Sequence, residues 1–214
     1  MSWNVPNAIT TLRLLLTPVL FYLLLQPGTG AKVAGMIVFA VAAVSDLWDG
    51  YLARRHGQIT DFGKLMDPLA DKLLLASALV PLYLLTRDST LMADVPLYDS
   101  VALWIVIVFL GREVLITGLR TVAARRGQVV EARKIGKHKA FLQNLFIGAA
   151  ILWVALAGGE RGVVEETGAA WATFHGWFIT VSLTVALVLT VYSMVVYVAA
   201  FSGLLRERVD AESA

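Results

Sequence analysis

Long apolar segments separated by short polar ones are the dominant pattern of this sequence. Six stretches are apolar over enough residues to cross the hydrocarbon core of a bilayer as helices, which takes roughly 20 residues. They are expected at about 9–25, 32–54, 62–85, 100–123, 140–156 and 175–201. Polar loops and helix breakers separate them, and the clearest breaker is Gln26-Pro27-Gly28-Thr29-Gly30. The pattern predicts an all-α integral membrane protein, built as a bundle of six transmembrane helices.

Composition supports this fold class and excludes some chemistry. The chain has 214 residues, of which 58% are hydrophobic, and its mean hydropathy is +0.72. These values exceed those of an ordinary soluble domain, and the length fits one membrane domain over 1–214. There are no cysteines, so disulfides, thiolate catalysis and zinc–thiolate sites are excluded. The N-terminus lacks a basic segment before the first apolar stretch, so we expect that stretch to be a retained span.

Basic residues are distributed unevenly between the two predicted membrane sides. Of the 18 lysines and arginines, 15 fall on one side, and only Lys32, Arg87 and Arg161 fall on the other. Cytoplasmic loops carry an excess of Lys and Arg. We therefore expect a multi-pass protein of the cell (inner, cytoplasmic) membrane with both termini in the cytoplasm.

Four aspartates lie in or beside the second and third apolar stretches: Asp46, Asp49, Asp67 and Asp71. An ionised carboxylate is costly there unless it is paired. Asp46 and Asp49 are three residues apart and Asp67 and Asp71 are four apart, so each pair shares one helix face. Converging carboxylates repel one another unless cations lie between them, and oxygen ligands suit Mg²⁺ or Mn²⁺. The spacing predicts a metal site near the basic, cytoplasmic surface.

Small residues and an arginine surround these carboxylates. Gly50, Ala53 and Gly63 leave space for a group to approach the backbone, and Arg54 can bind a phosphate in bidentate fashion. Together with acidic metal ligands they suit a metal-bound pyrophosphate. Close packing between helices is the alternative explanation for the small residues.

The whole stretch resembles the signature of the CDP-alcohol phosphotransferase family, D-x2-D-G-x2-A-R-x8-G-x3-D-x3-D. Every fixed position is present, namely Asp46, Asp49, Gly50, Ala53, Arg54, Gly63, Asp67 and Asp71. The resemblance implies six transmembrane helices, a homodimer and a site for Mg²⁺ or Mn²⁺, with two ions expected. It also implies that an alcohol attacks a nucleotide-linked lipid and releases CMP.

The resemblance also implies a role for each of these residues. Asp46, Asp49 and Asp67 would hold metal, and Asp71, also at the metal site, would deprotonate the attacking hydroxyl. The residues expected to bind the CDP-lipid are Asp49, Gly50, Ala53, Arg54, Thr60 and Gly63.

The second half of the chain carries cations that can recognise an acceptor. Arg112 and Arg120 are eight residues apart in an apolar stretch, about two helical turns, and Lys137 opens the next one. These three cations suit a soluble acceptor that carries a phosphate. Glu113 is expected to pair with a neighbouring cation. For other basic residues, such as Arg125, contact with lipid headgroups is the favoured explanation.

These cations and the N-terminal segment resemble one branch of the family. Arg112-Glu113-x3-Thr117-Gly118-Leu-Arg120 and Gly136-Lys137-x-Lys139 are similar to the phosphatidylglycerophosphate synthase branch. That resemblance implies transfer of phosphatidyl from CDP-diacylglycerol to sn-glycerol 3-phosphate among membrane lipids, with no nucleic-acid partner. Asn7, Thr10 and Arg13 share a helix face, and capping or headgroup contact explains them about as well as a place in the nucleotide pocket.

Other functions stay open at this stage. Within the family the acceptor can be inositol phosphate, serine or phosphatidylglycerol, although the three cations disfavour serine. Membrane prenyltransferases also bind pyrophosphate through aspartates and Mg²⁺, but they usually carry two separated Asp-rich motifs. A cation transporter can use intramembrane carboxylates, but it does not need small residues and an arginine at fixed offsets.

Overall fold

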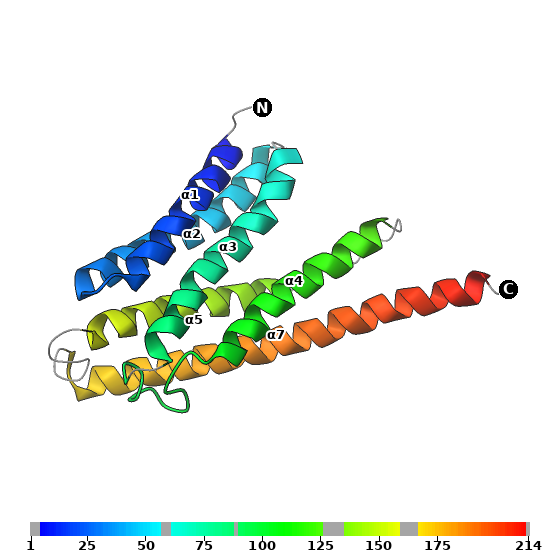
Figure 1. The fold of residues 1–214 in the computed structure, drawn as a ribbon. Coiled ribbons are helices and arrows are strands. Elements are labelled where there is room, and N and C mark those ends of the chain that lie inside the picture. The colour runs from blue at the N-terminus through cyan, green and yellow to red at the C-terminus, as the bar shows by residue number, and fades with distance from the viewer. Residues whose placement is uncertain (1–4, 57–60, 88–89, 126–134, 159–166, 213–214) are drawn as a thin grey trace.

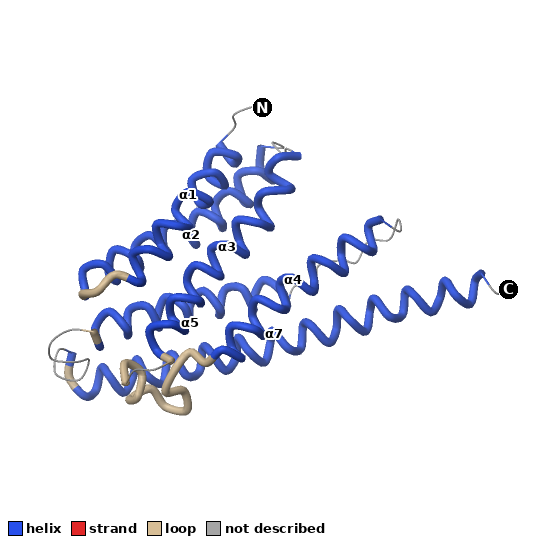
Figure 2. Tube along the Cα trace, in the orientation of Figure 1, coloured by secondary structure: helices blue, strands red, loops and turns tan. Residues whose placement is uncertain are grey.

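The computed structural model describes residues 5–56, 61–87, 90–125, 135–158 and 167–212. Within these ranges the regular structure is entirely helical (Figure 2). The helices are α1 (Val5–Leu25), α2 (Thr29–His56), α3 (Asp61–Thr86), α4 (Leu103–Arg125), α5 (Ile135–Ala157) and α7 (Ala169–Glu212). The bounds of α1 to α4 lie within four residues of those predicted from hydropathy. The prediction of an all-α membrane protein is confirmed.

Four of the helices within the described residues are long and apolar enough to cross a membrane: α1, α3, α5 and α7. The described apolar part of α2 is shorter, at Thr29–Ser45. Helix α4 carries Arg112, Glu113 and Arg120 along its length. The structure shows how these charges are accommodated, because polar partners on α5 and α7 contact them.

The helices form two groups that meet near one end of the molecule (Figure 1). Helices α1, α2 and α3 pack together, and α4, α5 and α7 form the second group. Helix α2 packs along α5, and α3 contacts α4 and α5. From this junction the groups diverge, so that the first turns of α3 and the last turns of α4 lie well apart in Figure 1.

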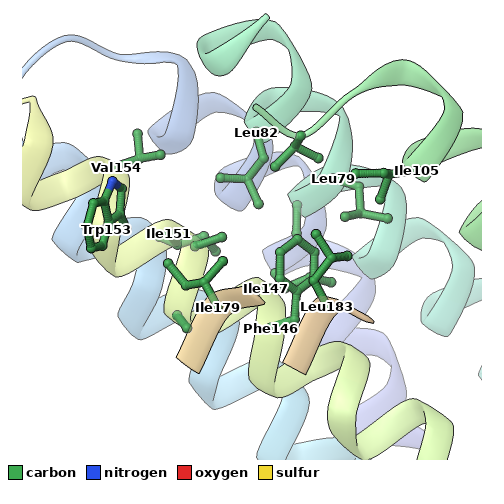
Figure 3. Close-up of a cluster of buried hydrophobic side chains, with 14 of the residues drawn as sticks. Leu79, Leu82, Ile105, Phe146, Ile147, Ile151, Trp153, Val154, Ile179 and Leu183 are labelled. Atoms are coloured by element: carbon green, nitrogen blue, oxygen red, sulfur yellow. The ribbon is translucent and has the colours of Figure 1, made fainter. Parts of the chain in front are cut away.

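The buried core lies at the junction of the two groups (Figure 3). Its side chains come from all six described helices and from the loop between α3 and α4. Figure 3 labels members from four of these helices: Leu79 and Leu82 of α3, Ile105 of α4, Phe146, Ile147 and Ile151 of α5, and Ile179 and Leu183 of α7. Lipid tails are as apolar as these side chains, so close packing rather than exclusion of water holds such helices together. The apolar core therefore holds the two groups together at the junction, and within the described residues it does not extend to their diverging ends.

The loop between α3 and α4 closes the junction end of the bundle. The indole nitrogen of Trp153 donates to the carbonyl of Leu91 at 2.7 Å, and the backbone amide of Val101 donates to Thr86 Oγ1 at 3.0 Å. Gly176 of α7 permits the close approach of this loop, because a Cβ there would lie 3.0 Å from Cδ of Pro96. The backbone of the loop is therefore held by side chains of α3 and α5, and the loop packs closely on α7.

Helix α7 is much longer than predicted from hydropathy. It has 44 residues, about 66 Å at the rise of an α-helix, against about 30 Å for the hydrocarbon core. The apolar stretch predicted at about 175–201 lies within α7, and the helix continues through the more polar residues that follow it to Glu212. Its last turns pass beyond the end of α4 in Figure 1.

Candidate active site

Two of the four predicted site aspartates contact α1. Helical spacing places Asp67 and Asp71 on one face of α3, and this face packs against α1. The hydroxyl of Thr10 donates to Oδ1 of Asp67 at 2.7 Å. The guanidinium Nη1 of Arg13 donates to Oδ1 of Asp71, also at 2.7 Å. The polar face of α1 therefore binds the second half of the aspartate signature.

These contacts lie on the buried side of the carboxylates. Arg13 is 0% exposed and Thr10 is 1% exposed, whereas the side chain of Asp71 is 54% exposed. Asp67 is half-buried. Each carboxylate is thus held from inside the bundle, and the Asp71 carboxyl is accessible from outside it. Carboxylates held in this way suit a hard cation, because a metal-binding carboxylate usually accepts hydrogen bonds from a second set of groups.

The other half of the signature is described at the level of the backbone only. Asp46, Asp49, Gly50, Ala53 and Arg54 lie within α2, and Gly63 lies within the first turn of α3. The positions of these side chains are outside what the structure describes, and Thr60 lies outside the described residues altogether. Among the described residues, no group of three or more His, Cys, Asp or Glu forms a metal site. Convergence of all four aspartates therefore stays a prediction.

A second polar cluster joins α4, α5 and α7. Oε1 of Glu113 accepts a hydrogen bond from Nη1 of Arg112 at 2.9 Å and another from Nζ of Lys139 at 2.6 Å. The Nε of Arg112 donates to Ser193 Oγ at 3.2 Å, and the Lys139 ammonium lies 5.9 Å from the centroid of the Phe109 ring. The expectation that Glu113 pairs with a neighbouring cation is confirmed.

The charges of this cluster do not cancel. The side chains of Arg112 and Lys139 are 10% and 3% exposed, and that of Glu113 is 25% exposed. Two cations share one carboxylate, so the three side chains carry one net positive charge in a largely buried position. An anion can balance that charge, and a phosphate matches the planar donor set of an arginine.

The three predicted acceptor-binding cations are placed differently. Arg112 belongs to the buried cluster, whereas Arg120 is exposed and lies over the ring of Tyr197, 5.3 Å from its centroid. Arg120 Nη2 also donates to the hydroxyl of Tyr197 at 2.5 Å. The side chain of Lys137 lies outside the described part of α5. Of these three cations, Arg112 is the one that the described side chains place in the buried cluster.

Several polar contacts were not predicted from the sequence. The contacts of Thr10 and Arg13 with the aspartates, and the places of Ser193 and Tyr197, depend on which helices pack together. Lys139 belongs to the pattern Gly136-Lys137-x-Lys139, but its contact with Glu113 was not predicted. One signal was present, since Ser193 and Tyr197 are polar residues four apart on an apolar helix.

The chain is similar to one known protein family over most of its length. The family model described as CDP-alcohol phosphatidyltransferase matches residues 3–192. This range contains the four signature aspartates, the ion-pair residues Arg112, Glu113 and Lys139, helices α1 to α5 and the first part of α7, and Ser193 lies just beyond it.

Curated relatives of the chain come from several bacteria. The CDP-diacylglycerol–glycerol-3-phosphate 3-phosphatidyltransferase of Bacillus subtilis is 37% identical over 162 residues, covering 70% of this chain and 77% of the relative. The probable phosphatidylglycerophosphate synthase of Mycobacterium tuberculosis is 38% identical over 152 residues, covering 70% of this chain and 66% of the relative. The CDP-diacylglycerol–glycerol-3-phosphate 3-phosphatidyltransferase of Rickettsia typhi is 34% identical over 149 residues, with 70% and 76% covered.

Proposed function

The chain belongs to the CDP-alcohol phosphatidyltransferase family, and we propose that it transfers the phosphatidyl group of CDP-diacylglycerol to sn-glycerol 3-phosphate. The products are phosphatidylglycerophosphate and CMP. The activity named for the relatives from Bacillus subtilis and Rickettsia typhi supports this choice of donor and acceptor.

The observation that carries the choice of acceptor is the net positive charge of the Arg112–Glu113–Lys139 cluster. A serine acceptor has no phosphate to balance this charge, whereas glycerol 3-phosphate brings a dianion. Charge-assisted hydrogen bonds to a phosphate are roughly twice as strong as neutral ones. In this proposal Arg112, Arg120 and Lys137 bind the acceptor phosphate, and Lys139 joins them as a fourth cation.

The aspartates would hold the metal and move a proton. Enzymes of this family generally use divalent metal ions, and we assign Asp46, Asp49, Asp67 and Asp71 as ligands of Mg²⁺ or Mn²⁺, with two ions bound. When bound, these ions supply charge stabilisation at the pyrophosphate. Asp71 takes the proton from the primary hydroxyl of the acceptor, and its partly exposed side chain is accessible for this.

The bond changes follow from this arrangement. The deprotonated acceptor oxygen forms a bond to the β-phosphorus of CDP-diacylglycerol, the bond from that phosphorus to the bridging oxygen breaks, and CMP leaves with the electron pair. The residues proposed to hold the CDP-lipid are Asp49, Gly50, Ala53, Arg54, Thr60 and Gly63.

The apolar helices and the family show a multi-pass membrane protein. The finer setting belongs to this proposal: a single domain over 1–214, a homodimer in the cytoplasmic membrane, both termini in the cytoplasm and the site facing the cytoplasm. The uneven distribution of Lys and Arg supports this orientation.

CMP release by the purified full chain tests the proposed function. The protein is incubated with CDP-diacylglycerol, Mg²⁺ or Mn²⁺, and one of four acceptors: glycerol 3-phosphate, inositol phosphate, serine or phosphatidylglycerol. We expect release with glycerol 3-phosphate alone. Release with another acceptor instead would overturn the acceptor assignment but keep the aspartate site. Absence of release with all four, from protein that binds metal, would overturn the proposed donor and acceptor.

A further inference from the structure

We propose that Thr10 and Arg13 of α1 are positioning residues, which orient the carboxylates of Asp67 and Asp71 for metal binding. The inference rests on the proposed function, since it concerns the same carboxylates. It gives a function to the polar face of α1. The sequence alone explained that face equally well by helix capping or headgroup contact and by a place in the nucleotide pocket.

The two contacts form a matched pair. Thr10 and Arg13 are three residues apart on α1, and their partners Asp67 and Asp71 are four apart on α3. Residues three and four apart lie on the same face of a helix. The two contacts therefore follow the same direction along both helices, and each donor reaches Oδ1 of its carboxylate at 2.7 Å.

The donors on α1 are buried, whereas the Asp71 carboxylate that is proposed to bind metal is exposed. Arg13 is completely buried and Thr10 is almost so, yet the side chain of Asp71 is more than half exposed. A carboxylate loses much of its rotational freedom when a buried donor holds one of its two oxygens. Groups that orient a metal-binding carboxylate typically change metal affinity or activity by about 10- to 100-fold when they are removed.

A purely structural role is the competing explanation, in which the pair only holds α1 on α3. Helix α1 packs along α3 and also contributes Leu20 and Leu24 to the buried core, so its place in the bundle does not depend on one hydroxyl. Replacing Thr10 by valine keeps the shape of the side chain and removes only the donor. Metal affinity therefore distinguishes the two explanations better than activity does.

The first experiment measures Mn²⁺ binding by the full chain in detergent, by electron paramagnetic resonance of the free ion. We expect Thr10→Val to weaken binding at least tenfold and Thr10→Ser, which keeps the hydroxyl, to stay within about threefold of the native protein. The matched control is Thr11→Val on the same helix, because Thr11 donates to the backbone carbonyl of Asn7. Equal affinity of Thr10→Val and the native protein would overturn the role of Thr10.

The second experiment asks whether Arg13 acts through Asp71. We expect Arg13→Met to weaken Mn²⁺ binding about tenfold, and Arg13→Lys, which keeps the charge, to weaken it less. In an Asp71→Asn background the same Arg13→Met change should alter the affinity less than twofold, because no carboxylate is left to orient. An equal loss in both backgrounds would overturn the inference for Arg13. Because the exposed Asp71 carboxyl can be hydrated, Arg13→Met is expected to fold.

These results can be separated from a failure of the proposed function. If the native protein binds Mn²⁺ and the variants differ as stated, the inference holds whichever acceptor is used. Native protein that releases CMP while Thr10→Val and Arg13→Met bind Mn²⁺ unchanged would overturn the inference and leave the proposed function standing. A native protein that binds no Mn²⁺ would overturn the inference itself.

Discussion

The ammonium nitrogen of Lys139 lies 2.6 Å from Oε1 of Glu113, and this ion pair joins α5 to α4. Arg112 binds the same oxygen at 2.9 Å. Without Glu113, two buried cations would face each other with no carboxylate between them. The stability of the α4–α5 contact and the binding of a phosphate there should therefore depend on Glu113 in different ways.

We expect Glu113→Gln to destabilise the protein by about 3–5 kcal/mol, because removing one partner of a buried ion pair leaves the other charge without compensation. Thermal unfolding in detergent measures this change. Asp94→Asn is the control, since Asp94 is an exposed acid in the loop between α3 and α4. It should change stability by less than about 0.5 kcal/mol. Equal stability of Glu113→Gln and native protein would mean that the ion pair contributes nothing to the free energy of unfolding.

Added phosphate should raise the unfolding temperature of Glu113→Gln more than that of the Asp94→Asn control.

Arg112→Lys should raise the KM for glycerol 3-phosphate at least tenfold and leave the KM for CDP-diacylglycerol within about threefold. The planar guanidinium uses Nε for Ser193 and Nη1 for Glu113 and keeps further N–H donors for a phosphate, whereas the donors of a lysine all lie on one nitrogen. Steady-state CMP release with each substrate varied in turn gives both constants. Arg125→Lys, at the exposed end of α4, is the matched control and should change neither. A similar rise in both KM values for Arg112→Lys would contradict a specific role at the acceptor.

Asp71→Asn should lower the rate of CMP release by about 10²- to 10⁴-fold, the usual contribution of a general base. Binding of CDP-diacylglycerol should stay largely intact, because other residues are proposed to hold the nucleotide. The measurement compares turnover with direct binding of the CDP-lipid by the same preparation. Near-normal turnover would remove Asp71 from the role of base.

Chelation should stop the reaction. Carboxylate oxygens such as those of Asp67 and Asp71 bind Mg²⁺ and Mn²⁺, and such ions stabilise the charge on a pyrophosphate. We expect EDTA to abolish CMP release and excess Mg²⁺ or Mn²⁺ to restore it. Turnover that persists in EDTA, after dialysis that removes bound metal, would argue against the metal assignment.

Gly176→Ala should destabilise the protein by about 1–3 kcal/mol, because the added Cβ meets Cδ of Pro96 at 3.0 Å in a packed region. The control is Gly203→Ala further along α7, where nothing lies within 4 Å of the added Cβ. That change should stabilise the helix by up to about 1 kcal/mol. Thermal unfolding of the two variants should therefore shift in opposite directions. The same sign for both would contradict the close approach of the loop to α7.

The sequence by itself determined the fold class and the positions of the first four helices. Apolar stretches of about 20 residues have few alternatives to a membrane-spanning helix, since every backbone polar group must be satisfied within the segment. The sequence also determined the family, because the aspartate signature is a local pattern whose spacing is set by helix geometry. It did not show how far α7 extends, since hydropathy marks where the apolar residues end and not where the helix ends.

Only the tertiary structure decided which polar groups meet. The contact between Arg13 and Asp71 joins residues 58 positions apart, and that between Arg112 and Ser193 joins residues 81 apart. Helical periodicity shows which residues share a face, but it does not show which helix that face contacts. The packing of α1 on α3, and of α4 on α5 and α7, brings these polar groups together. The physical reason is that a buried charge must find its partner across a helix interface, and the sequence of one helix does not specify its neighbour.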